Sequence, residues 1–66
     1  MLSYHARLAL VFFEGKSRAD RTPATLAAIV RHVALSYAMP PASRASLLVE
    51  VTAEAQRRGV VREEVC

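Results

Sequence analysis

The chain contains three segments in which apolar residues recur every three or four positions, separated by short polar or proline-containing stretches. This spacing places apolar side chains along one face of an α-helix. It predicts helices over residues 3–14, 23–38 and 41–58, followed by a tail over residues 60–66. We therefore expect a single all-α domain over residues 1–66, made of an N-terminal helix and a helical hairpin.

Residues at the ends of the segments agree with these boundaries. Ser3 is suited to cap the first helix, and Pro23 is favoured at the first position of the second. Pro40 and Pro41 separate the second helix from the third, because a residue before proline avoids the α region. Gly59 follows two arginines and is typical of the position just past a helix end.

The first predicted helix is apolar on two opposite faces, and its stretch LALVFF has no polar residue. At about 100° per residue, one face carries Tyr4, Leu8, Val11 and Phe12, and the other carries Leu2, Ala6, Ala9, Leu10 and Phe13. A helix that is apolar nearly all round is buried nearly all round. Something beyond the other two helices must therefore cover one face.

We expect a second copy of the chain to supply that cover, because a chain of this length is marginally stable alone. The predicted inner face of the first helix joins two further apolar rows, which consist of Leu26, Ile29, Val30, Val33 and Tyr37, and of Leu47, Leu48, Val51 and Ala55. The predicted homodimer interface consists of Leu2, Ala6, Leu10 and Phe13. Adjacent side chains on a helix diverge, so one of Phe12 and Phe13 serves the core and the other serves the interface.

Two alternatives for this segment remain open. In the first, a compact three-helix unit buries both faces itself. In the second, the segment forms a β-strand, since Phe and Val favour sheets. The tail VVREEVC would then pair as a second strand; otherwise it packs as an extended arm or frays.

Cysteine and histidine usage excludes the other common ways of stabilising a small domain. Cys66 is the single cysteine, so no internal disulfide forms. His5 and His32 have no cysteine or carboxylate neighbours at ligand spacing, and we expect no metal and no cofactor. The apolar run before Glu14 is too short to cross a bilayer and has no cleavage pattern after it, so we expect a cytoplasmic protein.

Charge is distributed unevenly along the chain, whose net charge is +3. Residues 1–44 carry six basic and two acidic side chains, and residues 45–66 carry three basic and four acidic ones. A basic half is compatible with nucleic acid or an acidic protein surface as a partner. It is equally compatible with a compositional preference for arginine.

The sequence contains no arrangement typical of an enzyme. It has no glycine-rich phosphate loop, and its two histidines lie on separate helices without an orienting carboxylate. Glu50 and Glu54 share one side of the third helix, as expected of a solvated face. We expect a non-enzymatic protein-interaction module, and its predicted partner surface on the second helix and the basic loop consists of Arg18, Arg21, Arg31, His32, Leu35, Tyr37 and Met39.

The main alternative is a helix–turn–helix DNA-binding regulator formed by the second and third helices. DNA binding would then fall steeply with salt, but Arg44, near the start of the reading helix, shares the face of Leu47, Leu48 and Val51 and does not point toward base edges. Against this alternative, the connector YAMPPAS is longer than the usual turn. A further alternative is a structural small subunit or an antitoxin-like dimer whose tail folds on a partner.

The stretches LALVFFEGK, TPATLAAIVRHVALSYAM and SRASLLVEVTAEAQRRG resemble, in size and order of helices, very small helical early proteins of temperate phages. The chain is similar to the phage anti-activators that inhibit a LuxR-type quorum-sensing regulator and the type IV pilus assembly ATPase. The resemblance implies a dimeric inhibitor in the host cytoplasm that binds the DNA-binding domain of a transcription activator. In that case Arg18, Arg21, Arg31 and Tyr37 would block the contacts of that domain by occlusion.

Overall fold

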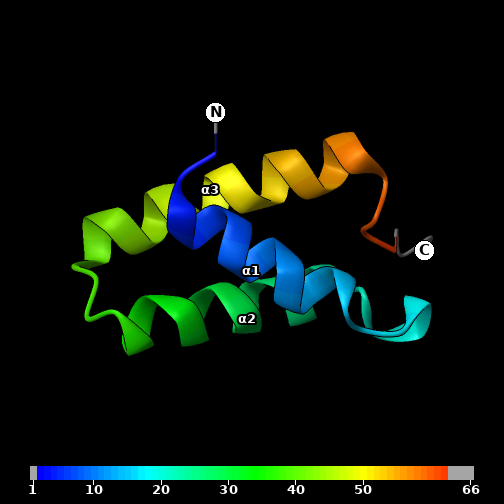
Figure 1. Cartoon of the computed structure of the whole chain (residues 1–66), viewed down its shortest axis with the longest axis horizontal. Coiled ribbons are helices and arrows are strands. Elements are labelled where there is room, and N and C mark those ends of the chain that lie inside the picture. Colours follow the sequence, from blue (N-terminus) through cyan, green and yellow to red (C-terminus); the bar gives the residue numbers. More distant parts are fainter. Residues whose placement is uncertain (1, 63–66) are drawn as a thin grey trace.

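A computed structural model describes residues 2–62 and confirms the all-α fold. Its elements are α1 (Tyr4–Glu14), the 3-10 turn η1 (Arg18–Asp20), α2 (Pro23–Ser36) and α3 (Pro41–Arg58). Helices α2 and α3 form an antiparallel hairpin, and α1 crosses in front of the pair and contacts both (Figure 1). Residues 2–62 contain no strand, so the strand alternative for LALVFF is wrong.

The predicted helix ends are confirmed with one exception. The Ser3 hydroxyl accepts a hydrogen bond from the Ala6 amide, and Gly59 ends α3 in the left-handed conformation. Helix α2 stops at Ser36 rather than at the predicted residue 38. Ala38 has a φ of 52°, and the Met39 amide donates to the Ala34 carbonyl at 2.9 Å, which closes the helix.

The core lies where the three helices meet. Its buried side chains are Ala6, Ala9, Leu10 and Phe13 from α1, Leu26, Val30 and Val33 from α2, and Leu47, Val51 and Ala55 from α3. Two alanines allow α1 to approach its neighbours closely, and Leu10 and Phe13 fill the space on either side of them. The inner face of α1 therefore consists of two small residues and two large ones.

This arrangement corrects the predicted dimer interface. Ala6, Leu10 and Phe13 lie in the core of the single chain, where Phe13 is completely buried, and Leu2 packs partly against that core. These residues are not available to a second copy. Phe12 and Phe13 do divide between the inside and the outside, but in the opposite sense to the prediction, because Phe12 is 51% exposed.

Two residues predicted to face inward lie on the surface instead. Tyr37 is 47% exposed because α2 has ended before it, and Leu48 is 38% exposed at the edge of the contact between α2 and α3. Ile29 is half-buried and packs against the core, as does Met39, which was predicted to contact a partner.

Helix α1 is fastened to α3 at both of its ends. The amide and the hydroxyl of Ser3 each donate to Glu50 at 3.0 Å, and Arg58 donates to Glu14 at 3.1 Å. The sequence predicts that Glu50 lies on a solvated face, but in the structure Glu50 binds the start of α1. The same Arg58 also pairs with Glu54 at 2.7 Å, so one guanidinium connects the last turns of α1 and α3.

The chain after α3 turns back toward the loop between α1 and α2. Val60 and Val61 pack against the core, and the Arg62 amide donates to the Arg21 carbonyl. Residues 60–62 thus pack against the rest of the chain and form no strand. The remainder of the predicted tail, residues 63–66, lies outside the described residues.

The two left-handed positions provide a matched pair of substitutions. Ala38→Gly relieves the strain of a Cβ in this conformation and raises the free energy of unfolding by about 1 kcal/mol. Gly59→Ala introduces the same strain and lowers the free energy of unfolding by about 1 kcal/mol. Only the backbone is affected, because no atom lies near an added Cβ. Urea denaturation measures both changes in the free energy of unfolding. If both variants change it in the same direction, the left-handed conformation of these two residues would be contradicted.

Glu54 makes stability depend on pH in acid. Hydrogen bonds from Arg57 and then Arg58 lower the pKa of Glu54 to about 2, from an ordinary value of 4.5. Because the folded chain binds this proton more weakly than the unfolded chain, the stabilisation is complete above about pH 4.5 and is lost as the pH falls toward 2. Glu54→Gln should lower the melting temperature at pH 6 and have little effect near pH 2. Identical pH profiles for both proteins would exclude this contribution.

Candidate functional site

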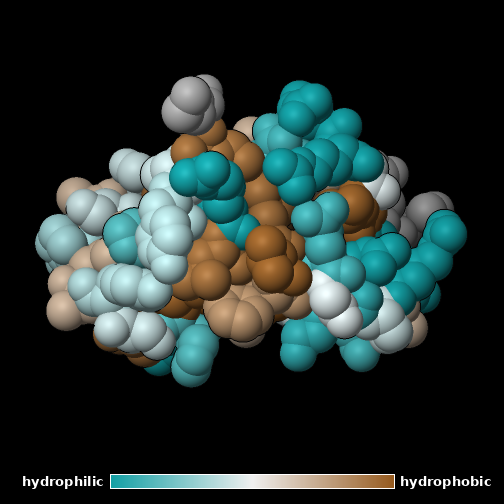
Figure 2. All heavy atoms as spheres, in the orientation of Figure 1, coloured by the Kyte–Doolittle hydropathy of each residue, from teal (hydrophilic) through white to brown (hydrophobic). Residues whose placement is uncertain are grey.

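Three large apolar side chains are exposed on α1. Its outer face, which we define as Tyr4, Val11 and Phe12, has side chains that are 58%, 66% and 51% exposed. Figure 2 shows apolar surface gathered near the middle of this side of the molecule, with polar surface on either side of it. An apolar centre within a polar rim is typical of a protein–protein interface.

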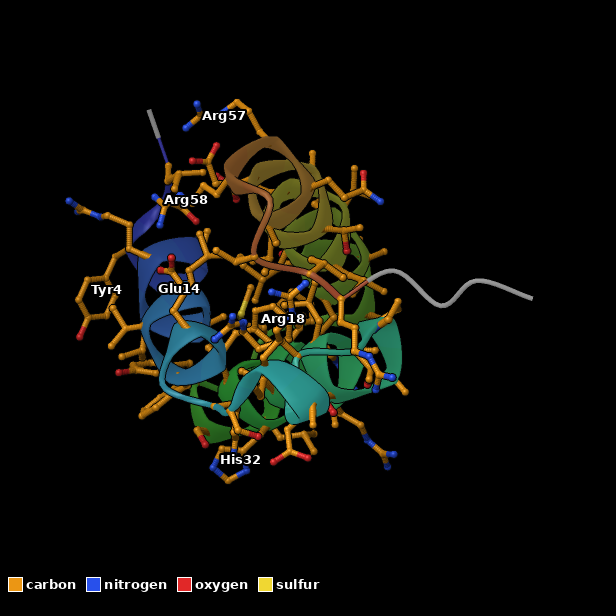
Figure 3. The ribbon with its side chains drawn as sticks, turned by 90° about the vertical axis from the view of Figure 1, so that its right-hand side faces the viewer. Tyr4, Glu14, Arg18, His32, Arg57 and Arg58 are labelled. Atoms are coloured by element: carbon orange, nitrogen blue, oxygen red, sulfur yellow. The ribbon has the colours of Figure 1, made fainter. Side chains whose placement is uncertain are left out.

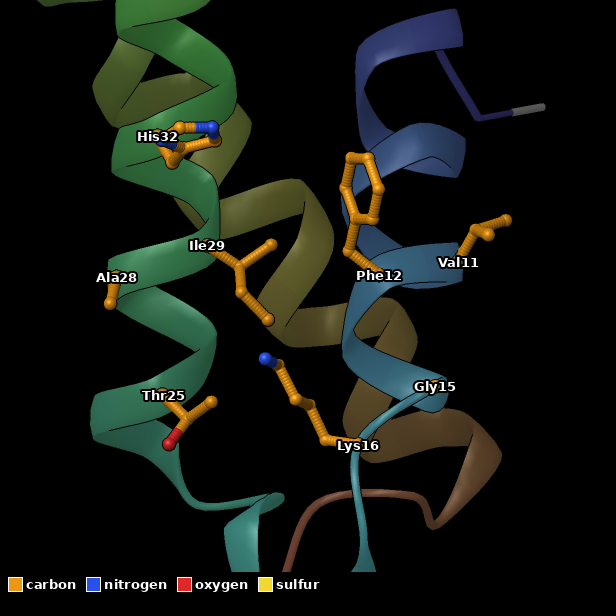
Figure 4. Close-up of a pocket in the computed structure, with 8 residues that line it drawn as sticks. All are labelled: Val11, Phe12, Gly15, Lys16, Thr25, Ala28, Ile29 and His32. Atoms are coloured by element: carbon orange, nitrogen blue, oxygen red, sulfur yellow. The ribbon is translucent and has the colours of Figure 1, made fainter.

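A groove runs beside this face, between α1 and α2. Its volume is about 590 Å³, and its lining residues are Val11, Phe12, Gly15, Lys16, Thr25, Ala28, Ile29 and His32. Figure 4 shows Phe12 on one wall, with Ile29 and His32 on the other, and Lys16 reaching between the helices at one end. The groove is thus apolar along its walls and carries basic groups at its edges, which suits an apolar side chain flanked by carboxylates.

Three aromatic rings meet where α1 begins and α2 ends. The His5 and Tyr37 ring centroids are 4.7 Å apart, and those of Tyr4 and Tyr37 are 6.3 Å apart, both with edge-to-face geometry. The nearby Tyr4 hydroxyl raises the pKa of Tyr37, through hydrogen bonding first and charge second. Tyr37 therefore extends the outer face of α1 onto α2 rather than filling the core.

The predicted partner residues do not form one surface. Arg18 is exposed and Arg21 half-buried at the loop end, where the Arg21 side chain donates to the Val60 and Lys16 carbonyls. Arg31, His32 and Leu35 are exposed on α2, and Leu35 is 56% exposed. We define the outer side of α2 as Arg31, His32, Leu35 and Tyr37, which are the exposed predicted residues on this helix and just after it.

Arg44, which lies near the start of α3, is held by its own chain. Its Nε donates to the Met39 carbonyl at 3.2 Å, and its side chain lines a shallow hollow with Arg31 and Leu48 between α2 and α3. This geometry orients the guanidinium toward the helix start rather than away from the molecule. It gives the helix–turn–helix alternative no specific support.

Sequence reasoning missed the groove and its residues Lys16, Thr25 and Ile29. The signal was present in LALVFF, whose two apolar faces predict that one remains uncovered, but the sequence alone did not identify the partly open face. The histidines are not brought together, because His5 stacks with the tyrosines while His32 lines the groove. In residues 2–62, no three side chains of His, Cys, Asp or Glu cluster as metal ligands would.

Comparison with protein-family models, with curated proteins and with solved structures finds no match to this chain. Among the helices of residues 2–62, none is both long enough and apolar enough to span a membrane.

Proposed function

We propose that the protein is a non-enzymatic interaction module, a homodimer that binds and inhibits a regulatory protein. The observation that carries the proposal is the outer face of α1, which exposes three large apolar side chains on a chain of 66 residues. Leaving this area in water forgoes about 25 cal/mol for each Å² that a partner would cover. The resemblance to phage anti-activators supports the class of partner, a LuxR-type transcription activator.

The order of charges along the outer face of α1 suits a second copy of the chain. Tyr4, Arg7, Val11 and Glu14 follow one another along the exposed side at helical spacing. In an antiparallel pair of helices with a two-fold axis near Val11, Arg7 of each copy lies beside Glu14 of the other. These opposite charges contribute little energy but fix the orientation of the pair, while the apolar residues between them contribute the affinity.

The area needed for such a dimer is within reach of this molecule. A stable interface buries about 1,000 Å² in total, or about 500 Å² on each copy. One copy has an accessible surface of 4577 Å², and its dimensions are 33 × 22 × 22 Å. The required 500 Å² is about one ninth of that accessible surface.

The outer side of α2 is then the surface for the regulatory protein. It carries arginine, histidine and tyrosine next to the exposed Leu35, and arginine and aromatic residues supply much of the energy at interface hot spots. Its charge is positive, so the inhibitor does not imitate DNA. It acts by occupying the surface with which the activator would contact its own target.

The dimer is tested by two neighbouring phenylalanines. Phe12→Asp should dissociate the dimer and leave the helix content largely unchanged, because Phe12 is half-exposed in the single chain. Phe13→Asp should unfold the chain, because it places a charge in the core and costs at least about 3 kcal/mol. Sedimentation equilibrium gives the mass, and circular dichroism gives the helix content. A Phe12→Asp protein that remains dimeric would exclude the outer face of α1 as the interface.

Partner binding is tested with two exposed aliphatic residues on different helices. Leu35→Asp should weaken binding to the purified DNA-binding domain of a LuxR-type activator by about thirtyfold, the effect of losing one hot spot. Val49→Asp, on α3 and 70% exposed, is the matched control and should leave binding unchanged. Isothermal titration calorimetry measures the affinity, and melting temperatures show that both variants fold.

The same titrations distinguish the alternative function. If the chain binds a DNA duplex with an affinity that falls steeply with salt, and does not bind the activator domain, the DNA-binding reading replaces the one proposed here. If Leu35→Asp and Val49→Asp weaken activator binding equally, the outer side of α2 is not the contact surface.

A further inference from the structure

A second hollow lies at the end of the molecule where the loop after α1 meets the chain after α3. Its volume is about 400 Å³, and its lining residues are Arg18, Arg21, Gly59, Val60, Val61 and Arg62. Figure 3 looks onto this end and shows Arg18 near its centre, between the loop ribbon and the returning C-terminal chain. Three guanidinium groups from two distant parts of the sequence thus share one small concavity.

Backbone carbonyl groups, rather than carboxylates, hold two of these arginines in place. The Arg21 Nε and Nη1 donate to the Val60 and Lys16 carbonyls at 2.9 Å and 3.1 Å. The Arg62 Nη1 donates to the Ala19 carbonyl at 3.4 Å. These bonds fix the side chains in position without neutralising their charge, and each guanidinium keeps further N–H groups available.

No arginine of the hollow forms an ion pair within the described part of the chain. The ion pairs of residues 2–62 join Arg57 and Arg58 to Glu14 and Glu54, and none includes an arginine of this hollow. The nearby Asp20 accepts a hydrogen bond from the Ser17 hydroxyl instead. An anion bound among these guanidinium groups would be attracted by their charge and would form charge-assisted hydrogen bonds.

We propose that this hollow binds a phosphate group. Arginine is suited to phosphate because its planar set of donors matches two oxygens at once. The observations favour one compact group over a nucleic-acid strand, because the hollow is small and Arg31 and Arg44 line a different hollow, between α2 and α3. The ligand is therefore a phosphate monoester or free phosphate, and a duplex backbone is the competing source.

Titration of the full chain with inorganic phosphate tests the site. The full chain is used because Glu63 and Glu64 follow Arg62 directly and must be present as possible competitors. At constant ionic strength, we expect saturable binding by calorimetry and a rise in melting temperature that sodium chloride does not reproduce. Phosphate that binds no better than chloride would overturn the proposal.

Variants locate the bound phosphate. Arg18→Gln and Arg62→Gln should each weaken phosphate binding on the order of tenfold, the effect of losing a charge-assisted hydrogen bond. Arg57→Gln is the control and should bind phosphate like the wild type, because the Arg57 side chain is 72% exposed and does not line the hollow. Arg21 is left intact because it also joins the loop to the returning chain. Equal phosphate affinity in all three variants would place the anion elsewhere and contradict the site.

Two further titrations separate this inference from its competitors. Adenosine monophosphate should bind with the same dependence on Arg18 and Arg62, whereas a DNA duplex that binds more tightly and depends on Arg31 and Arg44 would show a nucleic-acid surface instead. Phe12→Asp should bind phosphate like the wild type, because Phe12 does not line the hollow. The experiments can therefore contradict the phosphate site without contradicting the proposed dimer, and the reverse.

Discussion

Burial of the inner face of α1 against the α2–α3 hairpin is the interaction on which the rest of the structure depends. Ala6 and Ala9 bring the helix close to its neighbours, and Phe13 supplies the largest fully buried side chain of the core. Ion pairs and hydrogen bonds to Glu50 and Arg58 then hold the two ends of α1 against α3. Once that face is fixed, geometry requires that Val11 and Phe12 point away from the core. The exposed apolar surface is thus a consequence of how the core is filled.

The helices and their ends could be predicted from the sequence because their signals are local. Ser3, Pro23 and Gly59 act on the backbone within one turn, and each does so in the structure. The choice between the two faces of α1 could not be predicted, since both are apolar and the outcome depends on which side chains fit between two other helices. The end of α2 was misplaced for a related reason: an alanine, not a glycine, takes the left-handed position there.

The same limit applies to the candidate sites. The sequence indicated the exposed residues of the outer side of α2, because polar and apolar positions alternate there with a helical period. It did not indicate that Arg21 ties the loop to the chain after α3, or that Arg62 comes beside it, because these contacts join residues about 40 positions apart. The molecule thus presents an apolar face on α1, a mixed surface on α2 and a basic hollow at the loop end. Each has a chemistry of its own, and the proposed dimer leaves the hollow uncovered.

The central claim is that α1 serves two polypeptides at once, with Phe13 inside its own chain and Phe12 against another. The most direct test is the mass of the wild-type protein in solution, measured by light scattering during size-exclusion chromatography under reducing conditions. The account predicts a mass of two chains that persists on dilution to the micromolar range. A mass of one chain at every concentration would contradict it, and the outer face of α1 would then be open to other partners.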